Sequence, residues 1–236
     1  MVRRLTLILT LAPAPTLTLT LTLTPTRYAA AASGPKDVVL VIDTSRSMAG
    51  NLNEMAKKAA KLVIDTLTAV DFVTIVRYSD TASAYSSKPV RATDTTKLAL
   101  KKWIDDNIVA FLDPVFGRPR NRIPNFIDAF ETAFAVIDMG PGTFFGGSNC
   151  NRIMLFLSGG APDEWRASHT EWIRSKAALY SPPMHVLTYG LGSGAKADDL
   201  KAIACRGNGI YYSVTADTIA NTMASYFQVW IARLDG

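Results

Sequence analysis

The sequence predicts an α/β fold, with a doubly wound, mainly parallel central sheet flanked by helices on both faces. Two observations lead to this prediction. Short apolar runs rich in β-branched residues, such as DVVLVID at 37–43, are typical of buried parallel strands. They alternate along the chain with longer stretches whose apolar residues recur at helical spacing. A regular alternation of strand and helix requires right-handed crossovers and helices on both sides of the sheet.

The strands are predicted from apolar runs that end at turn-forming residues. The run RIMLFLS at 152–158, for example, is followed by Gly159 and Gly160, and MHVLTY at 184–189 is followed by Gly190. In chain order, the predicted strands cover residues 37–43, 72–78, 152–158, 184–189 and 210–213, with 83–90 as an edge strand.

The helices are predicted from apolar stripes. Phe126, Phe130 and Phe134 recur every four residues, which places them on one side of a helix. Residues 109–122 are rich in Pro and Gly and predict a loop. In chain order, the predicted helices cover residues 51–67, 95–108, 125–139, 163–179, 198–205 and 218–232.

The N-terminal segment 1–33 has the composition of a secretory signal. Arg3 and Arg4 precede the uncharged stretch 5–26, and small residues follow at 29–32, so cleavage is expected near Ala32. The alternatives are a low-complexity Leu-Thr segment or a membrane anchor, although three prolines interrupt the stretch as a spanning helix. The remaining residues, 36–236, are expected to form one domain, secreted or on the extracellular face of the membrane.

The charge of the chain argues against nucleic acid as a partner. The chain carries 25 basic and 20 acidic residues. Without the three arginines of the N-terminal segment, 22 basic residues face 20 acidic ones, and nucleic-acid binding rests on concentrated positive charge. One basic cluster remains within the predicted loop, at Arg118, Arg120 and Arg122.

A run of oxygen-bearing side chains follows the first predicted strand. Asp43, Ser45 and Ser47 alternate along DTSRSM, where a turning loop can direct all three at one spot. Carboxylate and hydroxyl oxygens are hard ligands suited to Mg²⁺, Mn²⁺ or Ca²⁺. The alternative is that the two serines only cap the next helix.

Residues 37–48 (DVVLVIDTSRSM) closely resemble the opening of von Willebrand factor A (VWA) domains. The resemblance covers nearly everything after Lys36. The CNR run at 150 and the segment 204–212 are most similar to the VWA domains of calcium-channel alpha-2/delta subunits and related Cache-containing proteins. It implies a Rossmann-like VWA fold and a non-enzymatic, extracellular domain for protein binding or adhesion. The alternative is a fragment of an alpha-2/delta-like auxiliary subunit, with a channel subunit as its membrane-protein partner.

The resemblance also implies a metal-ion-dependent adhesion site, which is incomplete in this chain. Asp43, Ser45 and Ser47 match the family's ligands, but Ile123 stands where a Thr is expected and Ser158 where an Asp is expected. A hard divalent cation depends on ligand number and negative charge, so binding of Mg²⁺, Mn²⁺ or Ca²⁺ is expected to be weak or absent.

A positive charge is expected near this incomplete site. Arg122 takes the place of a Gly that usually precedes the missing Thr. Arg122, with Arg118 or Arg120, is therefore a candidate to bind a partner's carboxylate directly, since guanidinium pairs well with carboxylates. The alternative is a solvated basic loop. Asp163 is a further candidate, because it or its neighbour Glu164 could substitute for the missing carboxylate.

Other motifs carry less weight. Ser158 raises the hypothesis of a hydrolase, but Gly-x-Ser-x-Gly is absent and nothing places His169 or His185 beside it. In the strand order that the resemblance implies, one strand separates Cys150 from Cys205, about 10 Å, whereas a disulfide needs its Cα atoms within about 7 Å. No intradomain disulfide is therefore expected, and pairing with another chain stays open.

Overall fold

The computed structural model describes residues 34–109, 123–138, 148, 150–162 and 165–224. Within these residues, seven strands form one sheet in the order β3-β2-β1-β5-β6-β7, with β4 pairing with β2. The strands are β1 (Lys36–Asp43), β2 (Phe72–Tyr78), β3 (Ala82–Ala84), β4 (Val90–Arg91), β5 (Asn151–Ser158), β6 (His185–Leu191) and β7 (Tyr211–Val214).

The sheet is mainly parallel, as predicted. β1 pairs in parallel with both β2 and β5, and the pairs β5–β6 and β6–β7 are also parallel. Only the short strands β3 and β4 run antiparallel, both against β2. The doubly wound α/β fold class is therefore confirmed.

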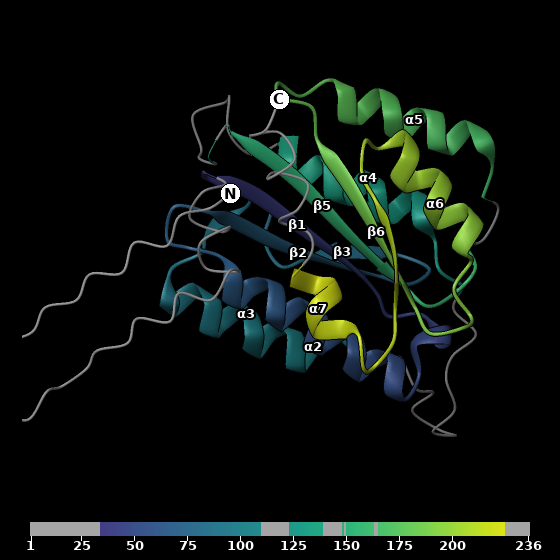
Figure 1. Ribbon diagram of the computed structural model, residues 1–236. Coiled ribbons are helices and arrows are strands. Elements are labelled where there is room, and N and C mark those ends of the chain that lie inside the picture. Colours follow the sequence, from purple (N-terminus) through teal and green to yellow (C-terminus); the bar gives the residue numbers. More distant parts are fainter. Residues whose placement is uncertain (1–33, 110–122, 139–147, 149, 163–164, 225–236) are drawn as a thin grey trace, which may run out of the picture.

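Helices cover both faces of this sheet (Figure 1). On one face, α2 (Asn51–Thr66), α3 (Asp94–Asn107) and α7 (Ile219–Ala224) pack over the even-numbered residues of β1. On the other, α4 (Phe126–Asp138), α5 (Ala167–Ala178) and α6 (Ala197–Arg206) pack over Val39 and Val41. Both clusters are fully buried, which accounts for the near-continuous apolar runs of the central strands.

The aromatic stripe of α4 forms the centre of the second cluster. The Phe156 ring stacks on Phe130, with centroids 4.6 Å apart, and on Tyr78, with centroids 5.2 Å apart. Phe126 meets Phe156 edge-on at 4.8 Å. Aromatic pairs in these geometries add to the stabilisation from area burial, so α4 is held firmly against β2 and β5.

Two predicted elements were wrong in extent. The edge strand predicted at 83–90 is two short strands, Ala82–Ala84 and Val90–Arg91, separated by bends in the backbone between them. The helix predicted from residue 163 begins at Ala167, after an extended Arg166 whose backbone N–H donates to His169 Nδ1 (3.1 Å). Residues 1–33 and 225–236, which include the predicted secretory signal and most of the predicted last helix, lie outside the described residues.

None of the helices in the described ranges is long and apolar enough to cross a bilayer. Cys150 and Cys205 are both exposed and free, and β6 lies between β5 and β7, the strands that follow them.

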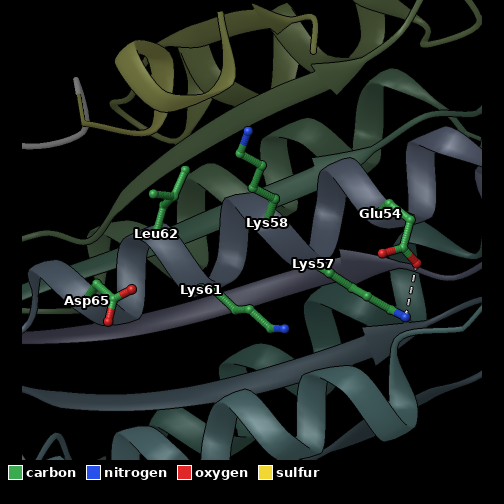
Figure 2. A pocket seen from close by; sticks show the side chains of 6 residues that line it. All are labelled: Glu54, Lys57, Lys58, Lys61, Leu62 and Asp65. Atoms are coloured by element: carbon green, nitrogen blue, oxygen red, sulfur yellow. Dashed lines mark ion pairs between the residues drawn. The ribbon is translucent and has the colours of Figure 1, made fainter. Parts of the chain in front are cut away.

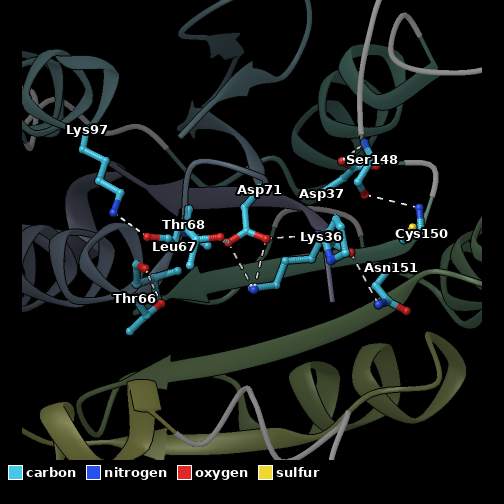
Figure 3. Close-up of polar contacts among 12 residues, drawn as sticks. Lys36, Asp37, Thr66, Leu67, Thr68, Asp71, Lys97, Ser148, Cys150 and Asn151 are labelled. Carbon is cyan, nitrogen blue, oxygen red and sulfur yellow. Dashed lines mark hydrogen bonds and ion pairs between the residues drawn. The ribbon is translucent and has the colours of Figure 1, made fainter. Parts of the chain in front are cut away.

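A buried ion pair joins β1 to the start of β2 at the amino edge of the sheet (Figure 3). The Lys36 ammonium donates to both carboxylate oxygens of Asp71, each at 3.2 Å, and both residues are fully buried. The Asp71 carboxylate also accepts from the backbone N–H of Lys36 (3.1 Å) and of Thr68 (2.6 Å). These donors compensate the burial of the carboxylate, although burial still lowers the pKa of Lys36.

Removing one partner of this pair should destabilise the domain strongly. Lys36→Met leaves the Asp71 carboxylate buried without its cation, so the free energy of unfolding should fall by about 3–5 kcal/mol. Urea denaturation measures it. The matched control is Lys102→Met, which breaks the exposed pair with Asp106 and should leave the free energy of unfolding close to that of wild type. Equal losses in the two variants would contradict the assignment.

Candidate functional site

Three polar side chains lie in a row at the carboxyl edge of the central strands. Asp43 and Tyr78 are register partners at the ends of β1 and β2. Ser158 ends β5, one residue beyond the Ile42–Leu157 pair, so it lies beside Asp43. β2 lies on one side of β1 and β5 lies on the other, so the strand order reverses between β1 and β5. Ligands of open α/β sheets bind at such switch points.

Protein donors occupy both oxygens of the Asp43 carboxylate. Oδ1 accepts from the backbone N–H of Ser45 (2.8 Å), and Oδ2 accepts from the Ser158 hydroxyl (2.9 Å) and, more weakly, from Gly159 N–H (3.4 Å). Asp43 is fully buried, and this burial raises the pKa of its carboxyl, while the hydrogen bonds from Ser45, Ser158 and Gly159 oppose the rise. The carboxylate is thus held by the chain itself.

The two serines of the motif lie with Asp43 at the same edge. The Ser45 and Ser47 hydroxyls are 2.8 Å apart and hydrogen-bonded to each other. Ser45 is fully buried, whereas Ser47 is exposed. The alternative that these serines cap the next helix is wrong: Gly50 is the N-cap of α2, and the Ser45 side chain makes no capping bond to the short 3-10 helix η1 (Arg46–Met48).

The loop after β5 packs tightly on the loop after β1. A Cβ atom built on Gly160 would lie 2.3 Å from Ser47 Oγ, and one built on Gly159 would lie 2.7 Å from Met48 Sδ. A side chain at either glycine would require Ser47 or Met48 to shift. The Gly159-Gly160 pair therefore ends β5 and also lets the next loop pack against the loop after β1, beside the Asp43 carboxylate.

Tyr78 is part of this edge, although the sequence analysis treated it only as a strand residue. Its side chain is fully buried, and its hydroxyl lies near the Ser158 side chain without forming a hydrogen bond of good geometry in the described part of the chain. Burial, and next the nearby Asp43 carboxylate, raise the pKa of Tyr78 well above its usual value. The signal that could have revealed it is its place at the end of a strand parallel to β1.

Ile123 lies just before α4 and is 46% exposed. The backbone N–H of Asn125 donates to Ser79 O (2.6 Å), the residue after Tyr78, so Ile123 is held near the end of β2. Arg118, Arg120, Arg122, Asp163 and Glu164 lie outside the described residues, and their expected roles stay predictions.

The described donor set does not fit a hard divalent cation. Asp43 is the only carboxylate beside Ser158, and no group of three His, Cys, Asp or Glu residues lies together among the described residues. The hydroxyls and the carboxylate are bonded to each other rather than turned toward a shared vacant point. Mg²⁺ and Ca²⁺ need about six or more oxygen ligands with negative charge among them.

The arrangement around Ser158 does not resemble a nucleophile with its base. Ser158 is fully buried, and its hydroxyl donates a hydrogen bond to the Asp43 carboxylate. His185 begins β6 at the opposite edge, where its Nδ1 contacts Asn208 O at 2.6 Å. His169 lies in the first turn of α5 and accepts from Arg166.

A hollow of about 300 Å³ runs along α2 rather than at the strand ends (Figure 2). Lys57 pairs with Glu54 at 3.2 Å and Lys61 with Asp105 at 2.5 Å, so most of its charge is compensated. It is lined by Glu54, Lys57, Lys58, Lys61, Leu62 and Asp65.

Comparison with protein families matches residues 36–213 to a model described as von Willebrand factor type A domain. The human voltage-dependent calcium channel subunit alpha-2/delta-4 is 28% identical over 203 residues, which are 83% of this chain and 16% of the relative. The rat alpha-2/delta-3 subunit is 26% identical over 206 residues, 83% of this chain and 17% of the relative. The chain thus spans about one sixth of the curated relatives it matches.

Solved structures agree on the fold. A von Willebrand factor type A protein from Catenulispora acidiphila has a TM-score of 0.65 at 21% identity, covering 82% of this chain and 42% of that chain. Proximal thread matrix protein 1 from the mussel byssus, described with a zinc occupied MIDAS motif, has a TM-score of 0.57 at 17% identity, covering 84% and 46%.

Replacing Tyr78 with Phe should be neutral or slightly stabilising near pH 7. The hydroxyl that the change removes is buried and unpartnered, so its loss should alter the free energy of unfolding by less than about 1 kcal/mol. The measurement is urea denaturation of both proteins.

The same pair of proteins tests the shifted pKa. An unfolded Tyr ionises near pH 10.0, whereas Tyr78 in the folded state stays neutral, so wild type loses stability as the pH rises above that value. Tyr78→Phe should lose about 1.4 kcal/mol less per pH unit in that range. Parallel pH profiles of the two proteins would show that Tyr78 ionises normally.

Proposed function

Because this chain belongs to the von Willebrand factor type A domain family, we propose that it is a non-enzymatic extracellular domain that binds a protein ligand at the carboxyl edge of its sheet. One observation carries the proposal: polar loops meet at the switch point between β1 and β5. Loops placed by a rigid scaffold are where binding residues concentrate.

The exposed groups at this edge suit a protein partner. Ser47 offers an accessible hydroxyl, and Ile123 offers an apolar side chain of which nearly half is exposed. Protein interfaces combine apolar anchors with polar groups around them. The stacked rings of Phe130 in α4 and Phe156 in β5 support the strands that end at this edge.

The proposal of a non-enzymatic role rests on access as well as on the family. Ser158, the candidate nucleophile, is covered completely and is bonded to a carboxylate. A substrate carbonyl would have to displace the loop after β5 to reach it, and no histidine of the described residues stands beside it.

The basic loop extends the proposed ligand chemistry. Arg122, with Arg120 or Arg118, would receive an acidic side chain of the partner as a bidentate ion pair. Asp163, which follows the β5 residues in the sequence, would flank it. The mussel byssus protein is described with zinc in its MIDAS motif; for this chain, we propose that Mg²⁺, Mn²⁺ or Ca²⁺ binds weakly or not at all.

Residues 1–33 are proposed to direct export and to be removed. The order of basic, apolar and small residues supports a secretory signal, and a membrane anchor remains the alternative. Determining the N-terminal residue of the secreted protein tests this. A mature chain beginning near residue 33 is expected, whereas a retained N-terminus would favour the anchor.

A second candidate function is a fragment of an alpha-2/delta-like auxiliary subunit of a voltage-gated calcium channel. The similarity to these subunits over 83% of the chain favours it. The test is co-expression with a calcium-channel pore subunit, measuring current density and co-purification. Co-purification that is lost in Ile123→Arg would support the channel partner. No co-purification of the wild type would leave the general binding role as the proposal.

The binding proposal predicts that Ile123→Arg weakens binding at least tenfold. The experiment screens the domain 34–236 against extracellular ectodomains by surface plasmon resonance and then compares variants on any ligand found. A charged side chain in place of an exposed apolar anchor removes more than about 1.4 kcal/mol of binding free energy. Arg122→Glu should weaken an acidic ligand similarly.

Leu98→Arg is the matched control, since Leu98 is exposed on α3, away from the strand ends. It should leave the affinity unchanged. A ligand whose binding depends on Leu98 and not on Ile123 would place the interface elsewhere and contradict the proposed edge.

A further inference from the structure

We propose that the hydrogen bond from the Ser158 hydroxyl to Asp43 takes the place of a divalent cation at the carboxyl edge. The loops after β1 and β5 then stay in contact without a metal. A single residue at the end of β5 would then decide metal dependence. The inference concerns the state of the domain itself and is independent of which ligand binds.

The described residues place a single carboxylate at the carboxyl edge. Asp43 is the one carboxylate described there, and Ser158 lies where a second carboxylate would create a need for a neutralising cation. Two carboxylates in a buried position repel one another and are stable only with a metal or a shared proton. One carboxylate needs only hydrogen-bond donors, and Ser158 Oγ supplies one at 2.9 Å.

Hydrogen-bond donors of the chain already contact both oxygens of the Asp43 carboxylate. The backbone N–H of Ser45 lies on Oδ1, the Ser158 hydroxyl lies on Oδ2, and the Tyr78 hydroxyl is buried near the same carboxylate. The Ser45 N–H and the Ser158 O–H each present the positive end of a dipole to the carboxylate. A cation at this point would have to displace these groups and pay for the lost hydrogen bonds.

Little space lies between the loops after β1 and β5. The backbone of Gly160 lies so close to Ser47 that even a Cβ atom would meet its Oγ at 2.3 Å. The Ser45 and Ser47 hydroxyls bond to each other at 2.8 Å. The two loops are therefore in direct contact beside Asp43, and they need no bridging ion to stay together.

The experiment compares the melting temperature of the domain 34–236 in 1 mM EDTA and in a series of MnCl₂ concentrations. For wild type, the melting temperature should be the same in both within about 1 °C, since nothing binds the folded state preferentially. Isothermal titration with MnCl₂ and MgCl₂ should show no saturable heat. Saturable stabilisation of wild type that Asp43→Asn abolishes would overturn the proposal.

Two substitutions of Ser158 separate its proposed role from simple packing. Ser158→Ala removes the donor to a buried carboxylate, so the melting temperature should fall by roughly 5–10 °C in EDTA and in MnCl₂ alike. Ser158→Asp should be destabilised in EDTA and recover saturably with Mn²⁺. At about a hundredfold excess over the dissociation constant, the recovery should reach roughly 5–10 °C.

Ser79→Ala is the matched control. Ser79 is a buried serine after the neighbouring strand β2, and its hydroxyl donates to Asp80, which is exposed and can be hydrated instead. It should cost less than Ser158→Ala and give no metal response. If Ser158→Ala melts with wild type, the hydroxyl does not hold Asp43 and the proposal fails. If Ser158→Asp does not fold, the wild-type titration and Ser158→Ala still decide.

Discussion

The hydrogen bond from Ser158 Oγ to Asp43 Oδ2 is the contact on which the carboxyl edge depends. It joins the ends of β1 and β5, the two central strands, across the switch point of the sheet. A carboxylate without solvent is costly unless donors compensate it. Because Asp43 is fully buried, the hydroxyl, two backbone N–H groups and the close loop packing together make this position possible.

The two edges of the sheet solve the same physical problem differently. At the amino edge, the Lys36 ammonium compensates the buried Asp71 carboxylate, with Thr68 adding a backbone N–H and a hydroxyl. At the carboxyl edge, neutral donors compensate Asp43, and no ammonium or guanidinium of the described residues contacts it. The first arrangement anchors the strands, whereas the second leaves Ser47 and Ile123 exposed at the same end of the sheet.

Much of the fold could be predicted from the sequence, and the site only in part. The runs at 37–43 and 72–78 are buried on both faces, so their apolar patterns mark strands without ambiguity. The edge strand failed because two or three paired residues leave no periodic signal. Asp43, Ser45 and Ser47 lie at the same edge, as their spacing predicts, while their role as metal ligands stays a prediction. The motif could not show that Gly160 packs against Ser47 or that Ser158 donates to Asp43, because these contacts arise from distant segments. The partner of Asp71 was missed for the same reason.

The most direct measurement is a crystal structure of the domain grown with 10 mM MnCl₂, with anomalous data collected at the manganese edge. The account predicts no anomalous peak between Asp43 and Ser158 and an unbroken hydrogen bond between them. A peak about 2.0–2.6 Å from the Asp43 carboxylate, with Ser158 turned away, would contradict it.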